Sequence, residues 1–346
     1  MNKASAHHTL IVGGAGYIGS VLAPVLLAAG HRVRVLDSLV YDNSDSLAAV
    51  ADHKGFEFVQ GDVRSARDTQ AAMEGVTDVV LLAALVGDPV CKRNPELTRE
   101  TNLDGARLVI DAARGSSVER FVFASTCSNY GLREDDEPAD EEESLHPLSL
   151  YAETKVEMER ELLGTENPFD AVVLRVSTAF GASPRMRFDL TVSEFTRELA
   201  LGRALEVYDA DTWRPYCHVS DISRGIAAVL DAPAERVGGE VFNLGGDDSN
   251  HTKRSIVESA LAALGGGEVK WSEGGADARN YRVSFSKIQA RLGFFPAETV
   301  DGAVRQLANS IRAGMFSDVE SRSLRYRNYE LTSDGSGEGS GGGDAG

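Results

Sequence analysis

Apolar runs alternate with amphipathic segments over the first half of the chain. The first run ends in a glycine-rich turn, which leads into a helix and a second strand, all between residues 8 and 38. Further strands are expected in FEFVQGD, TDVVLLAA, RFVFAST and DAVVLRVST, with helical segments such as ELTRETNLDGARLVIDAAR between them. Apolar strands separated by helices indicate a parallel sheet that is covered on both faces. We therefore expect an α/β fold, a Rossmann-type doubly wound parallel sheet.

This rhythm ends near residue 180, which suggests a second structural unit. VSEFTRELALGR and IVESALAALG are expected to be helices between short strands and loops. HVSDISRGIAAVL is typical of a strand end followed by a helix, so residues 214–233 are expected to return to the sheet domain. The predicted organisation is a nucleotide-binding domain over 8–180 and a smaller α+β substrate-binding domain over 181–213 and 234–330.

The composition limits the possible classes of protein. The 346 residues include 35 Lys+Arg and 53 Asp+Glu, a net charge of −18, so nucleic acid is not expected as a partner. Much of the acidity lies in 133–144, which is expected to be a solvated loop, and the Gly/Ser-rich tail 333–346 is expected to be disordered. No apolar run approaches a membrane span or the core of a signal peptide. The three cysteines are widely spaced and no His/Cys/Asp set has metal-ligand spacing, so we expect a reducing cytoplasm, no disulfides and no metal.

The turn after the first strand contains Gly13, Gly16 and Gly19, in the pattern GxxGxxG. Glycines there permit a tight turn and a close approach of the backbone to a pyrophosphate at the start of a helix. Asp37 ends the second strand, where a carboxylate can accept both ribose hydroxyls of NAD and would repel the 2′-phosphate of NADP. The alternatives are a bare packing turn and an aspartate that only caps the next turn. The cofactor is predicted to be NAD, with the adenine and ribose near the ends of strands three and four at Asp62, Leu82, Ala83 and Ala84.

The segment YAETK places Tyr151 and Lys155 on one face of a helix, one turn apart. An ammonium near a phenol favours the phenolate, so the pKa of Tyr151 is expected to fall and the tyrosine to act as a general base. On its own this spacing occurs often on ordinary surface helices. Here it follows a dinucleotide turn and a strand that ends in Ser125 and Thr126.

Together, GGAGYIG, Asp62-Val63, STCSNYG, YAETK and WRPYCHVSD resemble the extended short-chain dehydrogenase/reductase family, specifically its nucleotide-sugar epimerases and dehydratases. The resemblance covers about residues 8 to 315. It implies that Thr126 hydrogen-bonds a sugar hydroxyl, Tyr151 takes the O4 proton and Lys155 holds the nicotinamide ribose. It also implies cofactor contacts at Tyr17, Ile18, Val63, Asn102 and Ser177, and a substrate site with Thr178, Arg214 and Arg279, in which the arginines clamp the diphosphate. The alternative for each arginine is a surface ion pair.

Two departures from the family pattern lie near the expected site: Leu81 replaces a common His, and Thr178 replaces a common Asn. The dehydratases carry Asp and Glu directly after the catalytic Thr, where this chain has Cys127 and Ser128. Three roles are open for Cys127: a small residue packed under the nicotinamide, a general acid or base, or a redox-sensitive thiol.

The first prediction for the function is therefore an NAD-dependent nucleoside-diphosphate-sugar epimerase that oxidises C4 transiently. The alternatives are a dehydratase that uses Cys127, a C4 dehydrogenase, and a non-catalytic NAD(P)-sensing protein, although such sensors usually lack the Tyr/Lys pair. The resemblance also implies a homodimer formed through the helices around 96–114 and YAETKVEMERELL.

Overall fold

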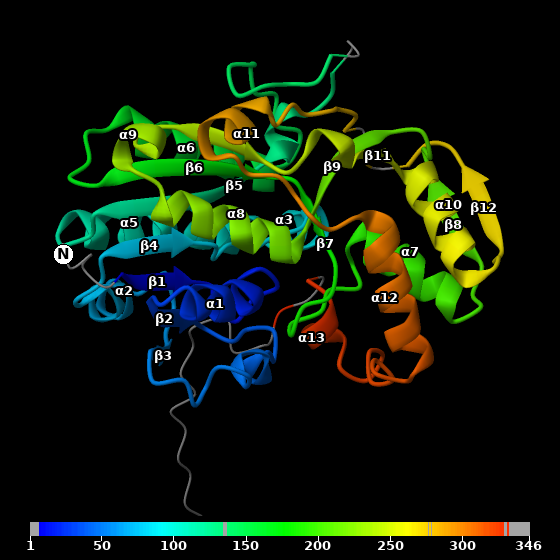
Figure 1. Cartoon of the computed structure of the whole chain (residues 1–346), viewed down its shortest axis with the longest axis horizontal. Coiled ribbons are helices and arrows are strands. Elements are labelled where there is room, and N and C mark those ends of the chain that lie inside the picture. Colours follow the sequence, from blue (N-terminus) through cyan, green and yellow to red (C-terminus); the bar gives the residue numbers. More distant parts are fainter. Residues whose placement is uncertain (1–6, 134–136, 276, 278, 329–330, 332–346) are drawn as a thin grey trace, which may run out of the picture.

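The central element of the fold is a seven-stranded sheet in the order β10-β6-β5-β4-β1-β2-β3, in which all pairings are parallel. The computed structural model describes residues 7–133, 137–275, 277, 279–328 and 331. Figure 1 shows the strands of this sheet one above another, with β6 near the top and β3 at the bottom. Its strands are β1 (His8–Val12), β2 (Arg32–Asp37), β3 (Phe56–Gln60), β4 (Asp78–Leu81), β5 (Arg120–Thr126), β6 (Asp170–Val176) and β10 (Val241–Leu244).

Side chains alternate along each strand and fill two cores, one on each face of the sheet. In β1, Ile11 packs into one core, whereas Leu10 and Val12 pack into the other. The first core is covered by α1 (Gly19–Ala28) and α8 (Val219–Asp231). The second is covered by α2 (Ala66–Met73), α5 (Ala106–Arg114) and α6 (Leu150–Gly164). The doubly wound parallel sheet expected from the sequence is thus confirmed.

A smaller unit with its own core lies at one end of the sheet, on the right in Figure 1. It contains a three-stranded sheet in the order β11-β9-β7 and a two-stranded sheet of β12 and β8. Its strands are β7 (Thr178–Phe180), β8 (Leu205–Tyr208), β9 (Trp213–His218), β11 (Asn250–Thr252) and β12 (Val269–Ser272). Its helices are α7 (Thr191–Ala200), α10 (Lys253–Leu264) and α12 (Val300–Arg312).

The chain crosses between the two units more often than the sequence indicates. The helix α8 packs against α1, and β10 then pairs with β6 as the outer strand of the main sheet. The range 234–330, which the sequence assigns to the substrate-binding domain, therefore includes one strand of the main sheet, β10. The segment DAVVLRVST, expected to be one strand, belongs to two strands in different sheets. Its first part is β6, which ends at Val176, and Thr178 begins β7 in the three-stranded sheet.

Short elements complete the described chain. The expected helix over 96–114 is interrupted by a π-helical turn, so that it consists of α4 (Pro95–Arg99), η2 (Glu100–Gly105) and α5. The remaining elements are α3 (Asp88–Arg93), α9 (Ala234–Val237), α11 (Ser286–Leu292), α13 (Ser323–Tyr326), η1 (Ser44–Leu47), η3 (Cys127–Tyr130) and η4 (Asp247–Ser249). Among the described helices, none has the length and apolar character needed to cross a bilayer. The tail 333–346 and part of the acidic segment, 134–136, lie outside the described residues.

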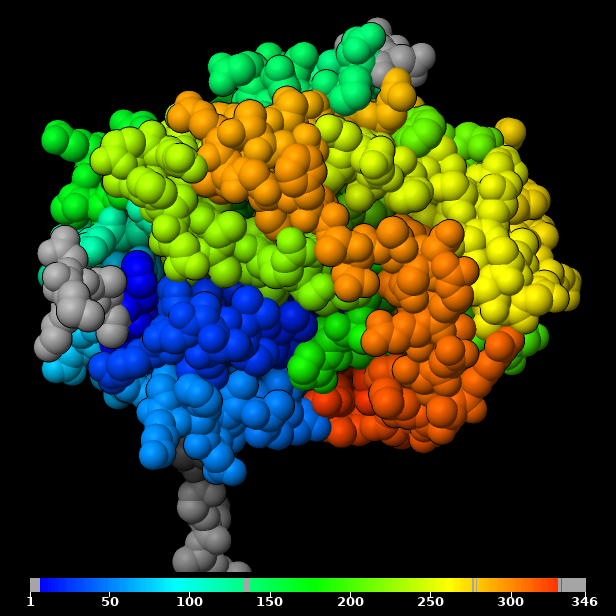
Figure 2. Space-filling view, in the orientation of Figure 1, coloured from blue at the N-terminus to red at the C-terminus, as the bar shows by residue number. Residues whose placement is uncertain are grey.

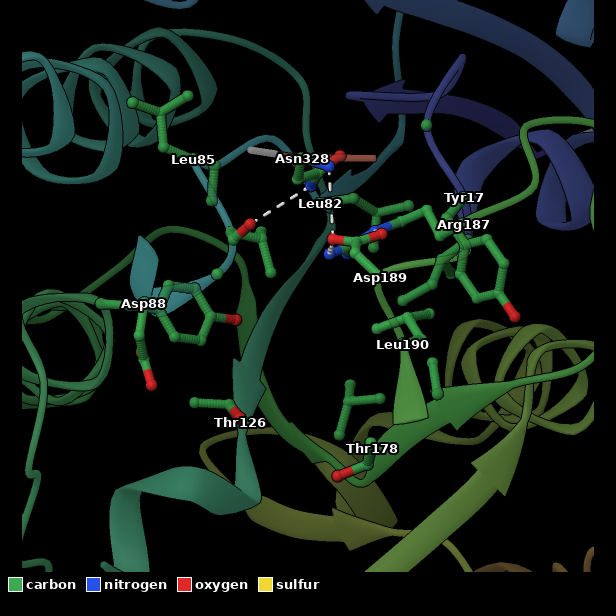
Figure 3. Close-up of a pocket in the computed structure, with 18 of the residues that line it drawn as sticks. Tyr17, Leu82, Leu85, Asp88, Thr126, Thr178, Arg187, Asp189, Leu190 and Asn328 are labelled. Carbon is green, nitrogen blue, oxygen red and sulfur yellow. Dashed lines mark hydrogen bonds and ion pairs between the residues drawn. The ribbon is translucent and has the colours of Figure 1, made fainter. Parts of the chain in front are cut away.

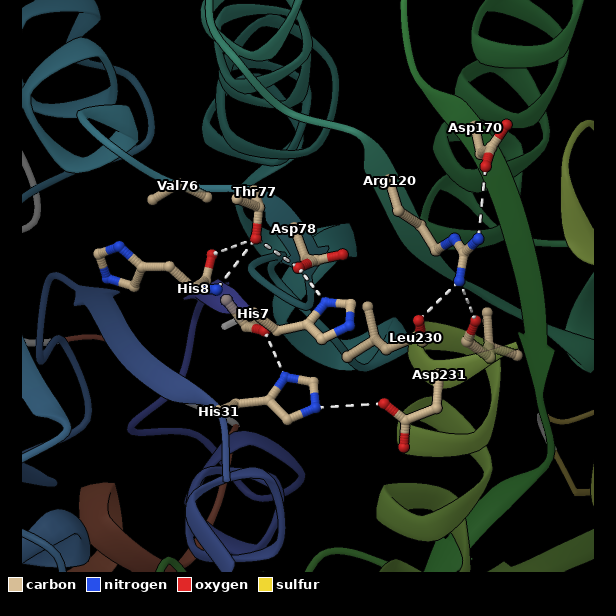
Figure 4. A network of polar contacts seen from close by, with 12 residues as sticks. His7, His8, His31, Val76, Thr77, Asp78, Arg120, Asp170, Leu230 and Asp231 are labelled. Carbon is tan, nitrogen blue, oxygen red and sulfur yellow. Dashed lines mark hydrogen bonds and ion pairs between the residues drawn. The ribbon is translucent and has the colours of Figure 1, made fainter. Parts of the chain in front are cut away.

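A polar network closes the amino-terminal ends of the strands, opposite the candidate site (Figure 4). The rings of His7 and His31 stack with centroids 4.8 Å apart. His7 Nδ1 lies 2.9 Å from Asp78 Oδ2, and His31 Nε2 lies 3.2 Å from Asp231 Oδ1. These contacts join β1, β2 and β4 to the end of α8, so His7 helps to hold these elements together.

Candidate active site

A cavity of about 950 Å³ opens at the carboxyl ends of the parallel strands, between the sheet and the smaller unit. Figure 3 shows Thr126 and Thr178 on one side of it and the pair Arg187 and Asp189 on another. Two predicted site residues, Asn102 and Cys127, do not line the cavity. The other predicted residues all do: Gly13, Gly16, Tyr17, Ile18, Gly19, Asp37, Asp62, Val63, Leu82, Ala83, Ala84, Thr126, Tyr151, Lys155, Ser177, Thr178, Arg214 and Arg279.

The glycine turn joins β1 to the start of α1, and Gly16, Tyr17, Ile18 and Gly19 line the cavity at this helix N-terminus. Gly13 has a φ of +85°, and a Cβ on it would lie 2.7 Å from the backbone nitrogen of Ala83. A Cβ on Gly19 would lie 2.5 Å from the Cα of Gly14. The backbone conformation and the packing therefore both require glycine, and the turn fits a pyrophosphate at the start of α1.

Asp37 presents an ionisable carboxylate at the end of β2. Its Oδ2 accepts a hydrogen bond of 2.9 Å from Ala15 N, and its Oδ1 accepts one of 2.9 Å from Leu39 N. Burial nevertheless raises the pKa of Asp37 above its usual value. Because each carboxylate oxygen has a second lone pair, the group can also accept from the hydroxyls of a ribose. This acceptor fits the ribose in the adenosine half of NAD.

The catalytic candidates converge from β5 and α6. Thr126 is the last residue of β5, and its Oγ1 lies 2.9 Å from Ser128 Oγ. Tyr151 lies in the first turn of α6, after the N-cap Ser149. One turn later, Lys155 Nζ donates a 2.7 Å hydrogen bond to the carbonyl oxygen of Ala124 and lies 5.9 Å from the centre of the Tyr151 ring. The three predicted catalytic side chains thus face one cavity.

The pKa of Tyr151 shifts in the direction opposite to the one expected from the sequence. Burial raises the pKa of its phenol above the usual range, whereas the sequence predicts a lower pKa. Burial also lowers the pKa of Lys155 to about 8. The reason is desolvation, which disfavours the charged form of both groups. Positive charge supplied with the cofactor would act in the opposite direction and favour the phenolate.

Cys127 does not join this group. Its side chain is 1% exposed, and its Sγ donates a hydrogen bond of 3.1 Å to the carbonyl oxygen of Arg175. Burial raises the pKa of the thiol well above its usual value. Cys127, which the sequence placed in the catalytic set, therefore lies apart from Thr126, Tyr151 and Lys155, because its thiol faces the core and not the cavity. This burial favours the packing role over the other two.

Asn102 also lies behind the cavity. Its Oδ1 accepts a 2.8 Å hydrogen bond from Leu85 N, and its Nδ2 donates to Leu85 O at 3.1 Å and to Thr154 Oγ1 at 3.3 Å. Asn102 therefore anchors the loop after β4 to α6, rather than lining the cavity as expected of a cofactor contact.

The two predicted phosphate-binding arginines meet at one carboxylate. Asp277 Oδ1 lies 3.0 Å from Arg214 Nη2 and accepts a hydrogen bond of 2.7 Å from Arg279 Nε. Arg279 Nη2 also lies 3.1 Å from Asp88 Oδ2. The guanidinium groups together hold Asp277 ionised, with its pKa well below the usual value. Arg214 is buried and lines the cavity, so it is not a surface ion pair.

Sequence reasoning missed two groups of residues. Ser128 lines the cavity beside Thr126, but it lies in η3, after β5 has ended, so the alternation of side chains along the strand could not place it. The second group comes from loops far apart in the sequence and consists of Tyr41, Asp189 and Asn328, together with Arg185 and Arg187, to which the sequence assigned no definite role. Met186, between the two arginines, packs in a separate apolar cluster.

A cavity at the carboxyl ends of a doubly wound sheet, with a glycine turn and a Thr/Tyr/Lys set, defines an NAD-dependent oxidoreductase-type site. The model of the NAD dependent epimerase/dehydratase family matches residues 9–245, and the chain belongs to this family. NAD is its cofactor; the glycine turn, Asp37 and Lys155 are the residues that would hold it.

Relatives with named activities cover most of the chain. A dTDP-glucose 4,6-dehydratase of Streptomyces griseus is 33% identical over 313 residues, which is 87% of this chain and 93% of that protein. A UDP-glucose 4-epimerase of Bacillus subtilis is 29% identical over 289 residues, 76% of this chain and 83% of that protein. Among solved structures, a Thermus thermophilus UDP-glucose 4-epimerase in complex with NAD has a TM-score of 0.77 at 28% identity and covers 88% of this chain and 99% of its own.

Proposed function

We propose that the protein is a nucleoside-diphosphate-sugar 4-epimerase. Thr126 hydrogen-bonds the sugar, and Tyr151 accepts the O4 proton and returns it after the sugar has turned over. NAD, held by the glycine turn, Asp37 and Lys155, would supply the acceptor for the C4 hydride and the source of its return to the opposite face. Lys155 is fixed by the Ala124 carbonyl and provides positive charge beside Tyr151.

The observation that carries this proposal is the orientation of the residues after Thr126. A 4,6-dehydratase needs an acid for the leaving hydroxyl and a base for the C5 proton, in addition to the tyrosine. Here Cys127 is turned into the core and Ser128 is a hydroxyl hydrogen-bonded to Thr126. The remaining Thr/Tyr/Lys set is sufficient for oxidation and reduction at C4.

The substrate class follows from the other end of the cavity. Arg214 and Arg279 are planar guanidinium groups that are held side by side by Asp277, an arrangement suited to a diphosphate. Lys253 also lines this end. A locally basic site of this kind can bind an anionic substrate despite the net charge of −18.

The dehydratase is the second candidate because the Streptomyces griseus relative carries that name. A simple experiment separates the reactions: nucleotide sugars with UDP, TDP, GDP and ADP, including heptoses, are incubated with the protein and NAD and analysed by mass spectrometry and NMR. A product of unchanged mass and inverted C4 supports the epimerase. A product lighter by one water would establish the dehydratase, and one lighter by two hydrogens, with NADH released, a C4 dehydrogenase.

We also propose a homodimer in the cytoplasm. The surfaces of α5 and α6 would meet those of a second copy, and Arg107 on α5 already pairs with Glu157 and Glu161 on α6. Sedimentation of the full chain tests the assembly. A single species of monomer mass at micromolar concentration would exclude it.

A further inference from the structure

The segment that follows β7 lies directly against the glycine turn. The hydroxyl of Tyr17 donates a 2.6 Å hydrogen bond to the carbonyl oxygen of Gly181. Ser183 Oγ donates one of 2.8 Å to the carbonyl oxygen of Tyr17 and lies 3.1 Å from Ser20 Oγ. Arg185, two residues further on, is thereby placed at the cavity beside the start of α1.

Arg185 is a buried cation with unused hydrogen-bonding capacity. Its side chain lines the cavity but is only 2% exposed. Its guanidinium lies 4.6 Å from the centre of the Tyr41 ring, and Nη2 donates a 3.4 Å hydrogen bond to Leu324 O. Within the described residues, neither Arg185 Nε nor the Tyr41 hydroxyl has a hydrogen-bond partner.

The charge of Arg185 is not matched by the groups around it. The neighbouring cation, Arg187, has its own carboxylate, because its Nε and Nη2 donate hydrogen bonds of 3.0 and 2.5 Å to Asp189. No carboxylate of the described residues forms an ion pair with Arg185. Burial, followed by the charge of Arg187, lowers the pKa of Arg185 to about 10, so the group still carries its proton at neutral pH. A buried cation of this kind is costly unless an anion enters the cavity.

We propose that Arg185, with the hydroxyl of Tyr41, binds the pyrophosphate of NAD from the side opposite the glycine turn. The two groups are donors that converge on the same cavity as the N–H groups of α1, and a pyrophosphate offers acceptors to both sides at once. The cavity is less suited to NADP, because the carboxylate of Asp37 would repel the 2′-phosphate. The diphosphate of the substrate has its own arginines, Arg214 and Arg279.

The carboxy-terminal segment holds Arg185 in this position. Leu324 accepts the hydrogen bond from its Nη2, and Arg325 Nη2 donates to the carbonyl oxygen of Pro184 at 3.2 Å. Phe188 N donates to Tyr326 O at 2.8 Å, and Arg322 Nη2 lies 2.8 Å from Asp42 Oδ2. Figure 2 shows this segment, in red, beside the blue loop that contains Asp42. Arg185 thus connects the carboxy-terminal segment to the cofactor.

The test compares ligands that contain or lack phosphate. Binding of NAD, ADP, adenosine and UDP to the full chain, freed of nucleotide, is measured by calorimetry, with adenosine measured by competition. For Arg185→Gln we expect the Kd of NAD and of ADP to rise about tenfold to a hundredfold, the range for loss of a charged hydrogen bond, and the Kd of adenosine and of UDP to change less than about twofold. Arg203→Gln, an exposed arginine with the same change in net charge, is the matched control and should leave every Kd unchanged.

Tyr41→Phe provides a second variant that keeps the shape of the ring. We expect a severalfold higher Kd for NAD and for ADP and no change for adenosine. Equal weakening of adenosine in the Arg185 variant would mean that the residue only supports the fold. Weaker UDP binding with unchanged NAD binding would assign Arg185 to the substrate, and an unchanged Kd for NAD would remove it from the cofactor site.

Discussion

Lys155 Nζ donates a hydrogen bond of 2.7 Å to the carbonyl oxygen of Ala124, which ties the first turns of α6 to the end of β5. Thr126 and Tyr151 lie on the two elements that this bond connects. The ammonium therefore sets the relative position of the two groups proposed to contact the sugar hydroxyl, in addition to any effect of its charge. Residues of β5 and α6 are thereby held in the one group that is proposed to act on the sugar.

Replacement of Tyr151 by Phe should remove catalysis and leave cofactor binding in place. We expect kcat for the nucleotide sugar to fall by about 10²–10⁴-fold, the usual contribution of a general acid or base, with an NAD affinity within a few-fold of the wild type. Steady-state rates and NAD calorimetry on the same preparation measure both. A kcat within tenfold of the wild-type value would assign the proton transfer to another group.

Lys155 should make the stability of the protein depend on pH. Its pKa is lowered from 10.5 to about 8, so between these values the unfolded chain binds more protons and the free energy of unfolding rises with pH. The gain is at most about 3 kcal/mol. Lys155→Met lacks this group, and urea unfolding of both proteins should show a wild-type advantage that grows from pH 8 to 10.5. A difference that stays constant over this range would mean that the ammonium is not desolvated.

Arg214→Gln should weaken the binding of the nucleotide and spare the cofactor. We expect the KM of the nucleotide sugar and the Kd of UDP to rise about tenfold or more, because a charged hydrogen bond to the diphosphate is lost. The Kd of NAD should not change, the reverse of the pattern expected for Arg185. Arg254→Gln, which breaks an exposed ion pair with Asp211, is the control. Unchanged UDP binding would place the diphosphate elsewhere.

Local features of the sequence were sufficient for the sheet and for much of the site. The glycine turn, Asp37 and the YAETK spacing each depend on neighbours within a few residues or one helical turn, so their geometry follows from the sequence pattern. The direction of the Cys127 side chain does not follow from alternation along β5, because the strand ends at Thr126 and Cys127 begins η3.

Other features depend on contacts that the sequence does not encode locally. The strand β10 joins the main sheet only through its pairing with β6, which lies far back in the chain. Arg185 meets Tyr41 and Leu324 from three separate regions of the chain. The raised pKa of Tyr151 depends on burial, in part against Leu85, Val90 and Cys91, which the spacing of Tyr151 and Lys155 does not reveal.

A buried ion pair beneath the site should be important for stability. Glu159, one turn after Lys155, lies 2.9 Å from Arg175 Nη2 and accepts hydrogen bonds from Ser125 and Asn129. Glu159→Gln would leave the buried guanidinium without a counter-charge, and we expect a loss of about 3–5 kcal/mol in the free energy of unfolding.

The control for Glu159 lies on the same helix. Glu157→Gln removes an exposed partner of Arg107 and should cost less than about 1 kcal/mol. Urea unfolding of the three proteins measures the difference. Equal costs for both variants would mean that the buried pair is no more important than a surface pair.

Cys127→Ala distinguishes packing from chemistry at the position where the dehydratases carry an acid. Because the thiol faces the core and donates to the carbonyl of Arg175, its loss should lower the free energy of unfolding by about 1–2 kcal/mol and leave kcat within a few-fold of the wild-type value.

Ser128→Ala is the matched comparison, since the Ser128 hydroxyl faces the cavity and lies 2.9 Å from Thr126 Oγ1. We expect this variant to lower kcat by about tenfold, with a smaller effect on stability. Rates of formation of the C4 epimer and thermal unfolding of both variants decide the matter. A folded Cys127→Ala protein that forms no epimer would show that the thiol takes part in the reaction, and the epimerase mechanism proposed above would then have to include it.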